Sequence, residues 1–171
     1  MTDTGFHYSA NRDAKILILG SMPSIKSLAA DQYYAHPQNC FWPIMGELFG
    51  FDAGLEYKAR LERLRDNGIA LWDVARQCER PGSLDSAIKI ESVVANDFES
   101  FFKVHPHIRA VFFNGRKSEE LYRRLVLPAL PEKLRGIELF LLPSTSPANA
   151  GMKRFQKLEV WKIVHQTLET E

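Results

Sequence analysis

The chain has 171 residues, which is enough for one domain with a sizeable core and short for two. Its apolar content of 45%, charged content of 25% and net charge of +1 are ordinary for a soluble globular protein and do not indicate a nucleic-acid partner. Cys40 and Cys78 lie far apart, which excludes a cysteine-ligated zinc or iron–sulfur site within one chain and a disulfide framework. Residues 1–13 lack a signal-peptide core, and no apolar run could span a bilayer, so we expect a cytoplasmic protein, associated with the nucleoid in a prokaryote.

The first part of the chain predicts one strand followed by helices. Residues 15–19 (KILIL) are a short continuous apolar run ended by a glycine, which is typical of a central strand in a parallel sheet. Residues 24–38 are polar and irregular, and we expect them to cross the end of the sheet. Apolar side chains recur at helical spacing over residues 39–49 and 55–65, which predicts two helices.

The rest of the chain continues the alternation. Further strands are predicted over residues 69–74, 110–113 and 137–142, and residues 75–90 are predicted to be a loop. Helices are predicted after an N-cap at Asn96, after Asn114 and Gly115, and over residues 152–169. This order predicts an α/β fold: a single three-layer α/β/α domain over residues 1–171, with a four-stranded, mostly parallel sheet and an N-terminal segment (1–13) free to be flexible.

Four strand ends converge on one edge of this sheet, at residues 20–24, 73–75, 114–115 and 143–149. Loops at the carboxyl ends of parallel strands build the ligand crevice of open α/β sheets. These loops are poor in charge and rich in small hydroxyl residues and proline. They suit a neutral polar ligand better than a metal or a triphosphate, and we expect neither a metal nor a cofactor.

The segment Gln32–Trp42 combines flat rings, an imidazole and an amide. Flat rings stack on bases, and an amide pairs with a base edge or orients a water molecule. A structural interpretation stands beside this one: Phe41 belongs to the apolar stripe of a helix, and Asn39 is a suitable N-cap. Asp73, at the end of a predicted strand, is either a helix cap or a structural hydrogen-bond acceptor.

Several common catalytic and binding motifs are absent. Paired carboxylates at glycosidase spacing, a G-x-S-x-G elbow around Ser144 or Ser146, a phosphate-binding GK[ST] and a dinucleotide fingerprint are all missing. Basic residues gather in two places, which indicates either DNA contact near helix N-termini or solvated helix faces. These residues are Arg116, Lys117, Arg123 and Arg124, and then Lys153, Arg154 and Lys157.

Three segments together resemble the uracil-DNA glycosylase superfamily. They are residues 20–24 (GSMPS), 34–42 (YAHPQNCFW) and 143–149 (PSTSPAN). Mismatch-specific members carry a water-activating asparagine at the third position of the first segment, where this chain has Met22. The GSxPS and LPSTSPAN motifs resemble the hypoxanthine-DNA glycosylase branch.

The resemblance implies a monofunctional DNA glycosylase in base excision repair. It would bind double-stranded DNA, flip a deaminated nucleotide, most directly deoxyinosine, into the cavity and hydrolyse its N-glycosidic bond as a monomer. The resemblance implies that Asn39 and Asn114 are the catalytic residues: Asn39 would hold the attacking water or the adjacent base edge, and Asn114 would read the polar edge of the base. The remaining expected site residues are Ser21, Met22, Tyr34 and Phe41 for base binding, and Ser24, Ser144, Ser146, Asn149 and Lys153 for DNA.

Three alternatives remain open at this point. The same fold could prefer uracil or thymine in mismatches, or could bind lesions without catalysis, because the first-segment asparagine is absent. A small-molecule hydrolase using Ser144 or Ser146 is a third interpretation.

Overall fold

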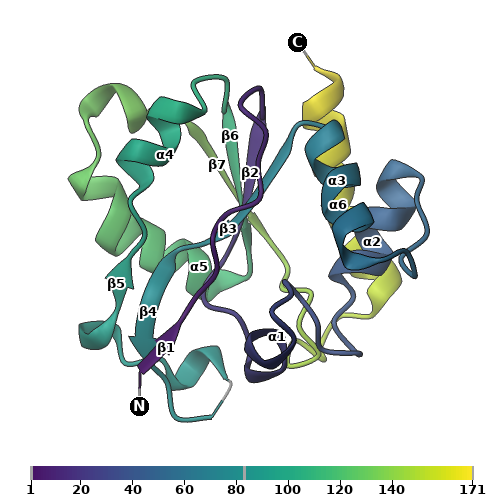
Figure 1. Ribbon diagram of the computed structural model, residues 1–171, viewed down its shortest axis with the longest axis horizontal. Helices are drawn as coiled ribbons and strands as arrows, with labels where there is room; N and C mark the ends of the chain where they lie inside the picture. The colour runs from purple at the N-terminus through teal and green to yellow at the C-terminus, as the bar shows by residue number, and fades with distance from the viewer. Residues whose placement is uncertain (1, 83, 171) are drawn as a thin grey trace.

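A four-stranded parallel sheet forms the centre of the computed structural model, which describes residues 2–82 and 84–170 (Figure 1). The strands lie in the order β3-β2-β6-β7, each parallel to its neighbours. Their bounds are Ile16–Gly20 for β2, Ile69–Asp73 for β3, Ala110–Asn114 for β6 and Glu138–Leu142 for β7. The four predicted strands and their parallel arrangement are thus confirmed.

Helices cover both faces of this sheet, which confirms the predicted three layers (Figure 1). In β2, Ile16 and Ile18 belong to one core and Leu17 and Leu19 to the other, because successive side chains of a strand point to opposite faces. The first core packs against α2 (Phe41–Phe49), α3 (Tyr57–Asp66) and α6 (Arg154–Glu169). The second packs against α4 (Phe98–Val104) and α5 (Arg116–Leu121), which continues as a π-helix over Tyr122–Val126.

A second, antiparallel sheet departs from the prediction. Its order is β1-β4-β5, with bounds Thr2–Thr4, Ala75–Glu79 and Val94–Ala95. The prediction of a loop over residues 75–90 was therefore wrong. The register of β4 shifts between Ala75 and Gln77, and this irregularity removes the strict alternation that would have indicated a strand. The N-terminal segment, expected to be free for flexibility, instead pairs Thr2–Thr4 with β4.

Two local details also differ from expectation. Helix α4 is capped by Asp97, whose side chain accepts a hydrogen bond from the Ser100 N–H, so the prediction of an Asn96 cap was wrong. Asn96 Nδ2 instead donates to the Asp73 carbonyl at 2.8 Å, which ties the start of α4 to the end of β3. The segment 24–38 contains the short helix α1 (Ile25–Ala30). Within the described residues, no helix is long and apolar enough to cross a membrane.

Candidate active site

A cavity of about 630 Å³ lies at the carboxyl ends of the parallel strands. The register places Gly20 beside Asp73 and Asn114 beside Leu142, so the four strand ends lie at one level. Its volume falls within the range of small-ligand sites. Among the expected site residues, it is lined by Ser21, Met22, Ser24, Tyr34, Asn39, Asn114, Ser144, Ser146 and Asn149.

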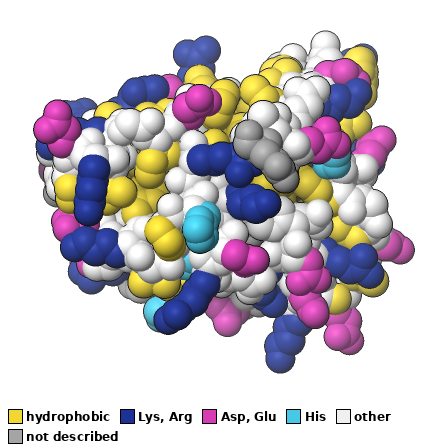
Figure 2. Space-filling model, turned by 90° about the horizontal axis from the view of Figure 1, so that it is seen from above, with side chains coloured by type: hydrophobic (Ala, Val, Ile, Leu, Met, Phe, Trp, Pro, Cys, Tyr) yellow, Lys and Arg dark blue, Asp and Glu magenta, His cyan; other side chains and the backbone are white. Residues whose placement is uncertain are grey.

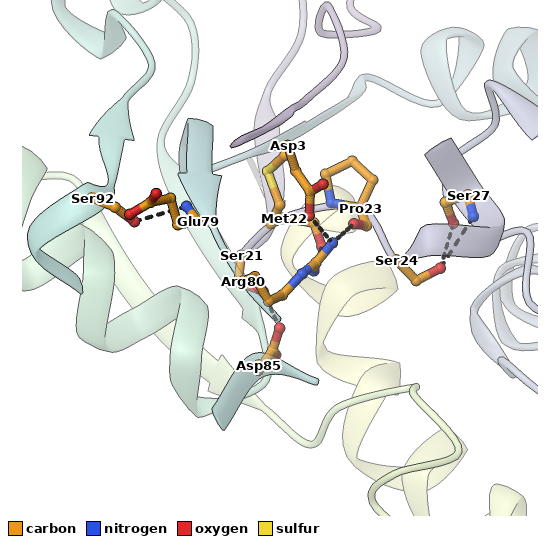
Figure 3. A network of polar contacts seen from close by, with 10 residues as sticks. All are labelled: Asp3, Ser21, Met22, Pro23, Ser24, Ser27, Glu79, Arg80, Asp85 and Ser92. Atoms are coloured by element: carbon orange, nitrogen blue, oxygen red, sulfur yellow. Dashed lines mark hydrogen bonds and ion pairs between the residues drawn. The ribbon is translucent and has the colours of Figure 1, made fainter. Parts of the chain in front are cut away.

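Buried Arg80 holds the loop that follows β2 (Figure 3). Its Nη2 donates to the Pro23 carbonyl at 2.6 Å and pairs with Asp3 Oδ2 at 3.1 Å, and its Nη1 lies 3.5 Å from the Met22 carbonyl. Two carbonyls and one carboxylate therefore fix the guanidinium, and the guanidinium fixes the backbone beside the cavity.

The hydroxyl of Ser21 is committed to an acid on a neighbouring segment. Ser21 Oγ donates to Asp85 Oδ1 at 2.6 Å, as Figure 3 shows. Asp85 begins a single 3₁₀ turn that, with the preceding Leu84, forms one wall of the cavity. Ser21 can thus accept a hydrogen bond from a ligand, while its proton is already used. Met22 is 6% exposed and packs with Ala75 and Ile88, so it offers the cavity only a thioether and its backbone.

Asp73 is a buried carboxyl in the same cavity. The residue is 3% exposed, its Oδ2 has no hydrogen-bond partner among the described residues, and the nearby helix α4 is capped by Asp97 instead. Burial raises the pKa of Asp73 to about 7, with a further increase from the Asp85 charge and an opposing effect of Arg80. Gly20 makes room for this carboxyl, because a Cβ there would lie 2.4 Å from Asp73 Oδ1.

The two candidate stacking rings occupy different positions. Tyr34 lines the cavity, whereas Phe41 is fully buried beneath it, with the ring centroids 4.1 Å apart. Phe41 therefore supports the ring of Tyr34 and does not itself reach a base, which corrects the expectation that it binds the base. Tyr34 adopts a left-handed backbone with φ of 56°, and the Trp42 indole fixes this turn by donating to the Tyr33 carbonyl at 2.8 Å.

Asn39 stands at the cavity edge with its amide oriented by the backbone. Its Oδ1 accepts a hydrogen bond from the Phe41 N–H at 2.9 Å, next to the start of α2. Only the oxygen can accept from that donor, so the Nδ2 group faces away from the helix. Nδ2 has no hydrogen-bond partner among the described residues, and Asn39 lines the cavity. The N-cap of α2 is Cys40, so the interpretation of Asn39 as the N-cap was wrong. Its oxygen instead binds the Phe41 N–H from the position before the cap.

Asn114 connects β6 to the loop over residues 143–149. Its Nδ2 donates to Thr145 Oγ1, and its Oδ1 accepts from the Thr145 N–H, both at 2.9 Å. Cys40 adds a third contact by donating its N–H to the Thr145 carbonyl at 3.1 Å. Asn114 thus lines the cavity while its amide is largely occupied in shaping the loop. One N–H of the amide remains available to a base.

The remaining hydroxyl residues also hold their own loops. Ser24 caps α1 by accepting from the Ser27 N–H. Ser144 Oγ accepts from the Ser146 N–H, and Ser146 Oγ accepts from the Ala148 N–H, each at 3.1 Å. Because Ser144 and Ser146 act as acceptors in these contacts, each hydroxyl proton is still able to bind a phosphate.

Fewer positively charged side chains lie at the cavity than the two basic clusters in the sequence suggest. Arg116 lines the cavity, whereas Lys117 pairs with Glu120 and Arg123 with Glu119 on the same helical segment. Lys153 is exposed at the start of α6 but does not line the cavity. A smaller hollow beside Asn39 is lined by Arg154 and by Lys157, whose Nζ donates to the Ser146 carbonyl.

The opposite end of the molecule has mixed charge. Figure 2 looks onto this end, and its Lys and Arg side chains are interspersed with Asp and Glu. Within residues 2–82 and 84–170, no group of three or more His, Cys, Asp or Glu side chains is placed to hold a metal ion.

We expect Gly115→Ala to destabilise the protein and to impair the site. Gly115 has φ of 96°, and a Cβ there would lie 3.0 Å from Ser144 Cβ. The left-handed backbone and the close contact together should cost about 1–3 kcal/mol of the free energy of unfolding. Chemical denaturation measures this loss. Gly136→Ala is the matched control, because nothing lies near the position of its Cβ; equal stability of the two variants would contradict the expectation.

Comparison with known proteins identifies the family. The sequence profile of the uracil DNA glycosylase superfamily matches residues 6–166, which include every segment that lines the cavity. The chain belongs to this superfamily. Members of it that are similar to the chain include a hypoxanthine DNA glycosylase of Methanosarcina acetivorans, 39% identical over 96% of this chain and 98% of the relative.

Two further comparisons agree with this assignment. A hypoxanthine DNA glycosylase of Methanosarcina barkeri is 38% identical over 92% of this chain and 94% of the relative. A solution NMR structure from Methanosarcina acetivorans, provisionally described as a uracil DNA glycosylase, matches with a TM-score of 0.81 and 37% identity. That match covers 99% of both chains, so the superfamily fold extends over the whole molecule.

Several residues at the site carried no clear sequence signal. Within residues 75–90, the segment predicted to be a loop, Asp85 lines the cavity and Arg80 holds the backbone beside it. Thr145 is the partner of Asn114. Each depends on contacts between residues far apart in the chain. A signal was present only for Asp73, as an acid at the end of a predicted buried strand.

Proposed function

We propose that this protein is a monofunctional DNA glycosylase that removes hypoxanthine from deoxyinosine in double-stranded DNA. The main support is the similarity, over nearly the full chain, to two relatives described as hypoxanthine DNA glycosylases. The cavity is consistent with this role, because it is lined by amides, hydroxyls and one ring, which suit a neutral, flat, polar base.

Asn39 is proposed to act at the sugar. Its free Nδ2 donates to the attacking water, which keeps a lone pair for C1′, or to the base edge beside it. An asparagine is a poor base, yet glycosidic cleavage can run ahead of water attack through an oxocarbenium-like sugar, so the water then needs position more than deprotonation. Charge grows on the leaving base at the same time, and donors in the cavity stabilise it.

Tyr34 and Asn114 are proposed to bind the base. The Tyr34 ring, supported from below by Phe41, stacks on the flipped base, and the remaining Asn114 N–H reads its polar edge. Ser21 and Met22 form the surface at the end of β2 against which the base rests.

DNA contacts are proposed around the rim of the cavity. The hydroxyls of Ser144 and Ser146 donate to phosphates, Ser24 adds a contact at the cavity, and Lys153 extends the contact outside it. Asn149 Nδ2 donates to the Ser144 carbonyl, so it holds the rim while residues 148–151 enter the gap left by the flipped nucleotide. The enzyme is proposed to act as a monomer, without a metal or cofactor.

Excision from a panel of oligonucleotides tests the function. Duplexes containing inosine, uracil, xanthine or thymine mismatches are incubated with the protein, and abasic sites are revealed by alkali. We expect hypoxanthine to be released at least about tenfold faster than uracil, because Met22 stands where mismatch-specific enzymes use an asparagine. Faster release of uracil or thymine would make it a mismatch-specific glycosylase, and binding without strand breaks would make it a lesion-binding protein.

A further inference from the structure

Asp73 carries a buried carboxyl in the cavity to which the mechanism above assigns no role. Asp73 lines the cavity and is only 3% exposed to solvent. Its Oδ2 receives no hydrogen bond from the described residues. A buried carboxylate without donors is strongly disfavoured, whereas a neutral acid requires only one acceptor for its proton. None of the described residues forms a hydrogen bond with Asp73 Oδ2, so a ligand bound in the cavity is left to accept the proton of this carboxyl.

The surrounding backbone holds this carboxyl in place. The Asp73 carbonyl accepts from Asn96 Nδ2 at 2.8 Å, and the strand pairs with Gly20 of β2. Gly20 lies so close that a Cβ there would overlap Asp73 Oδ1. The end of β3 is thus rigid, and the orientation of its carboxyl toward the cavity is built into the sheet.

The charged and titratable neighbours allow the neutral form at physiological pH. Burial, followed by repulsion from Asp85, raises the pKa of Asp73 to about 7. Arg80, the cation whose charge opposes this rise, is held by Asp3 and by the carbonyls of Met22 and Pro23, not by Asp73. The remaining titratable groups that interact electrostatically with it are the phenols of Tyr33, Tyr34 and Tyr57.

We propose that Asp73 is a catalytic residue, the general acid that donates its proton to an acceptor nitrogen on the imidazole ring of the departing purine. This inference rests on the proposed function and adds to it both a proton donor and a reason for purine preference. Purines of this class present N7 as an acceptor, and pyrimidines have no such atom.

The step balances without any further reactant. The carboxyl proton moves to N7 as the C1′–N9 bond breaks, and the bonding electron pair stays on the base, which leaves as a neutral molecule. Water held at Asn39 adds to C1′, and the proton that it loses returns through solvent to the Asp73 carboxylate. Protonation removes the negative charge that would otherwise develop on the leaving group, which is the gain that general acid catalysis provides.

Single-turnover excision of hypoxanthine, measured as a function of pH, tests the proposal. The parent rate should fall about tenfold per pH unit above the Asp73 pKa, because only the protonated acid is active. Asp73→Asn keeps an N–H donor but cannot transfer a proton, so its rate should drop at least about 100-fold and lose that pH dependence. Asp31→Asn, the same change at an exposed acid with a left-handed backbone, is the control and should retain the parent profile.

A second test of the proposal measures ligand binding, so it needs neither the Asp73→Asn variant nor catalytic turnover. Titration of free hypoxanthine into the parent protein at several pH values should show affinity falling as pH rises through the same range. A parent that releases no base from any duplex would refute the proposed function. If the parent is active but its rate and its hypoxanthine affinity do not fall as the pH rises, the role of Asp73 alone would be overturned. An Asp73→Asn variant with the parent rate would have the same consequence.

Discussion

Replacing Asn39 with alanine should reduce single-turnover excision about 100-fold while DNA binding persists. The loss of one well-placed hydrogen bond to a transition state typically costs about 3 kcal/mol of activation free energy. The Asn39 Nδ2 group has no protein partner among the described residues, and Asn39 lines the cavity, so the variant removes a donor available to the ligand. It also removes the acceptor of the Phe41 N–H. Quenched-flow excision on inosine duplexes and a filter-binding isotherm give the two quantities.

Two variants separate the donor from the helix-start role of Asn39. Asn39→Asp keeps the oxygen that accepts from the Phe41 N–H but removes the amide donor, so we expect it to lose activity as the alanine variant does. Gln38→Ala changes the neighbouring exposed amide and should leave the rate unchanged. Parent-like excision by Asn39→Ala would remove this residue from the mechanism.

Replacing Arg80 with methionine should lower the free energy of unfolding by about 3 kcal/mol. The Arg80 side chain is 1% exposed, and its loss leaves the Pro23 carbonyl and Asp3 without their donor. The loop beside the cavity then loses its anchor, so excision should weaken as well, even though Arg80 does not contact the base. Urea denaturation gives the stability change, and single-turnover kinetics give the effect on the site.

An exposed ion pair supplies the control for this variant. Arg123 pairs with Glu119 at 3.4 Å with half of its side chain exposed, and such pairs contribute between zero and about 1 kcal/mol. Arg123→Met should therefore change stability by less than that amount. If the two methionine variants unfold at the same urea concentration, the buried guanidinium does not support the loop as described.

The central sheet was predictable because its strands carry local signals. Residues 16–19 and 110–113 are apolar on both faces, which is typical of a strand buried between two helical layers. The small antiparallel sheet was not predictable for the opposite reason. Its strand β4 contains a register shift, exposes Arg76 and ends at Glu79, so its pattern resembles that of a loop.

The site could be predicted in part from the sequence. What could not be predicted depends on contacts between side chains that only the folded chain brings together. Polar residues directly after strands, such as Asn114, could be placed at the cavity because parallel strands end at one edge. Whether an aromatic ring faces a ligand or the core could not be decided in this way. Tyr34 and Phe41 are separated by seven positions and stack on each other. Only tertiary packing determines which of the two rings faces the cavity and which faces the core.

The two ends of the chain lie at opposite poles of the molecule (Figure 1). Strand β1 begins at Thr2, which pairs with Glu79 of β4, whereas α6 ends at Glu169 near the amino ends of the parallel strands. A dye, purification handle or surface linker attached through the C-terminus would leave the cavity side unobstructed. The same attachment at the N-terminus would add bulk next to the Asp3–Arg80 pair, so assays on immobilised or labelled protein are best built from the C-terminal end.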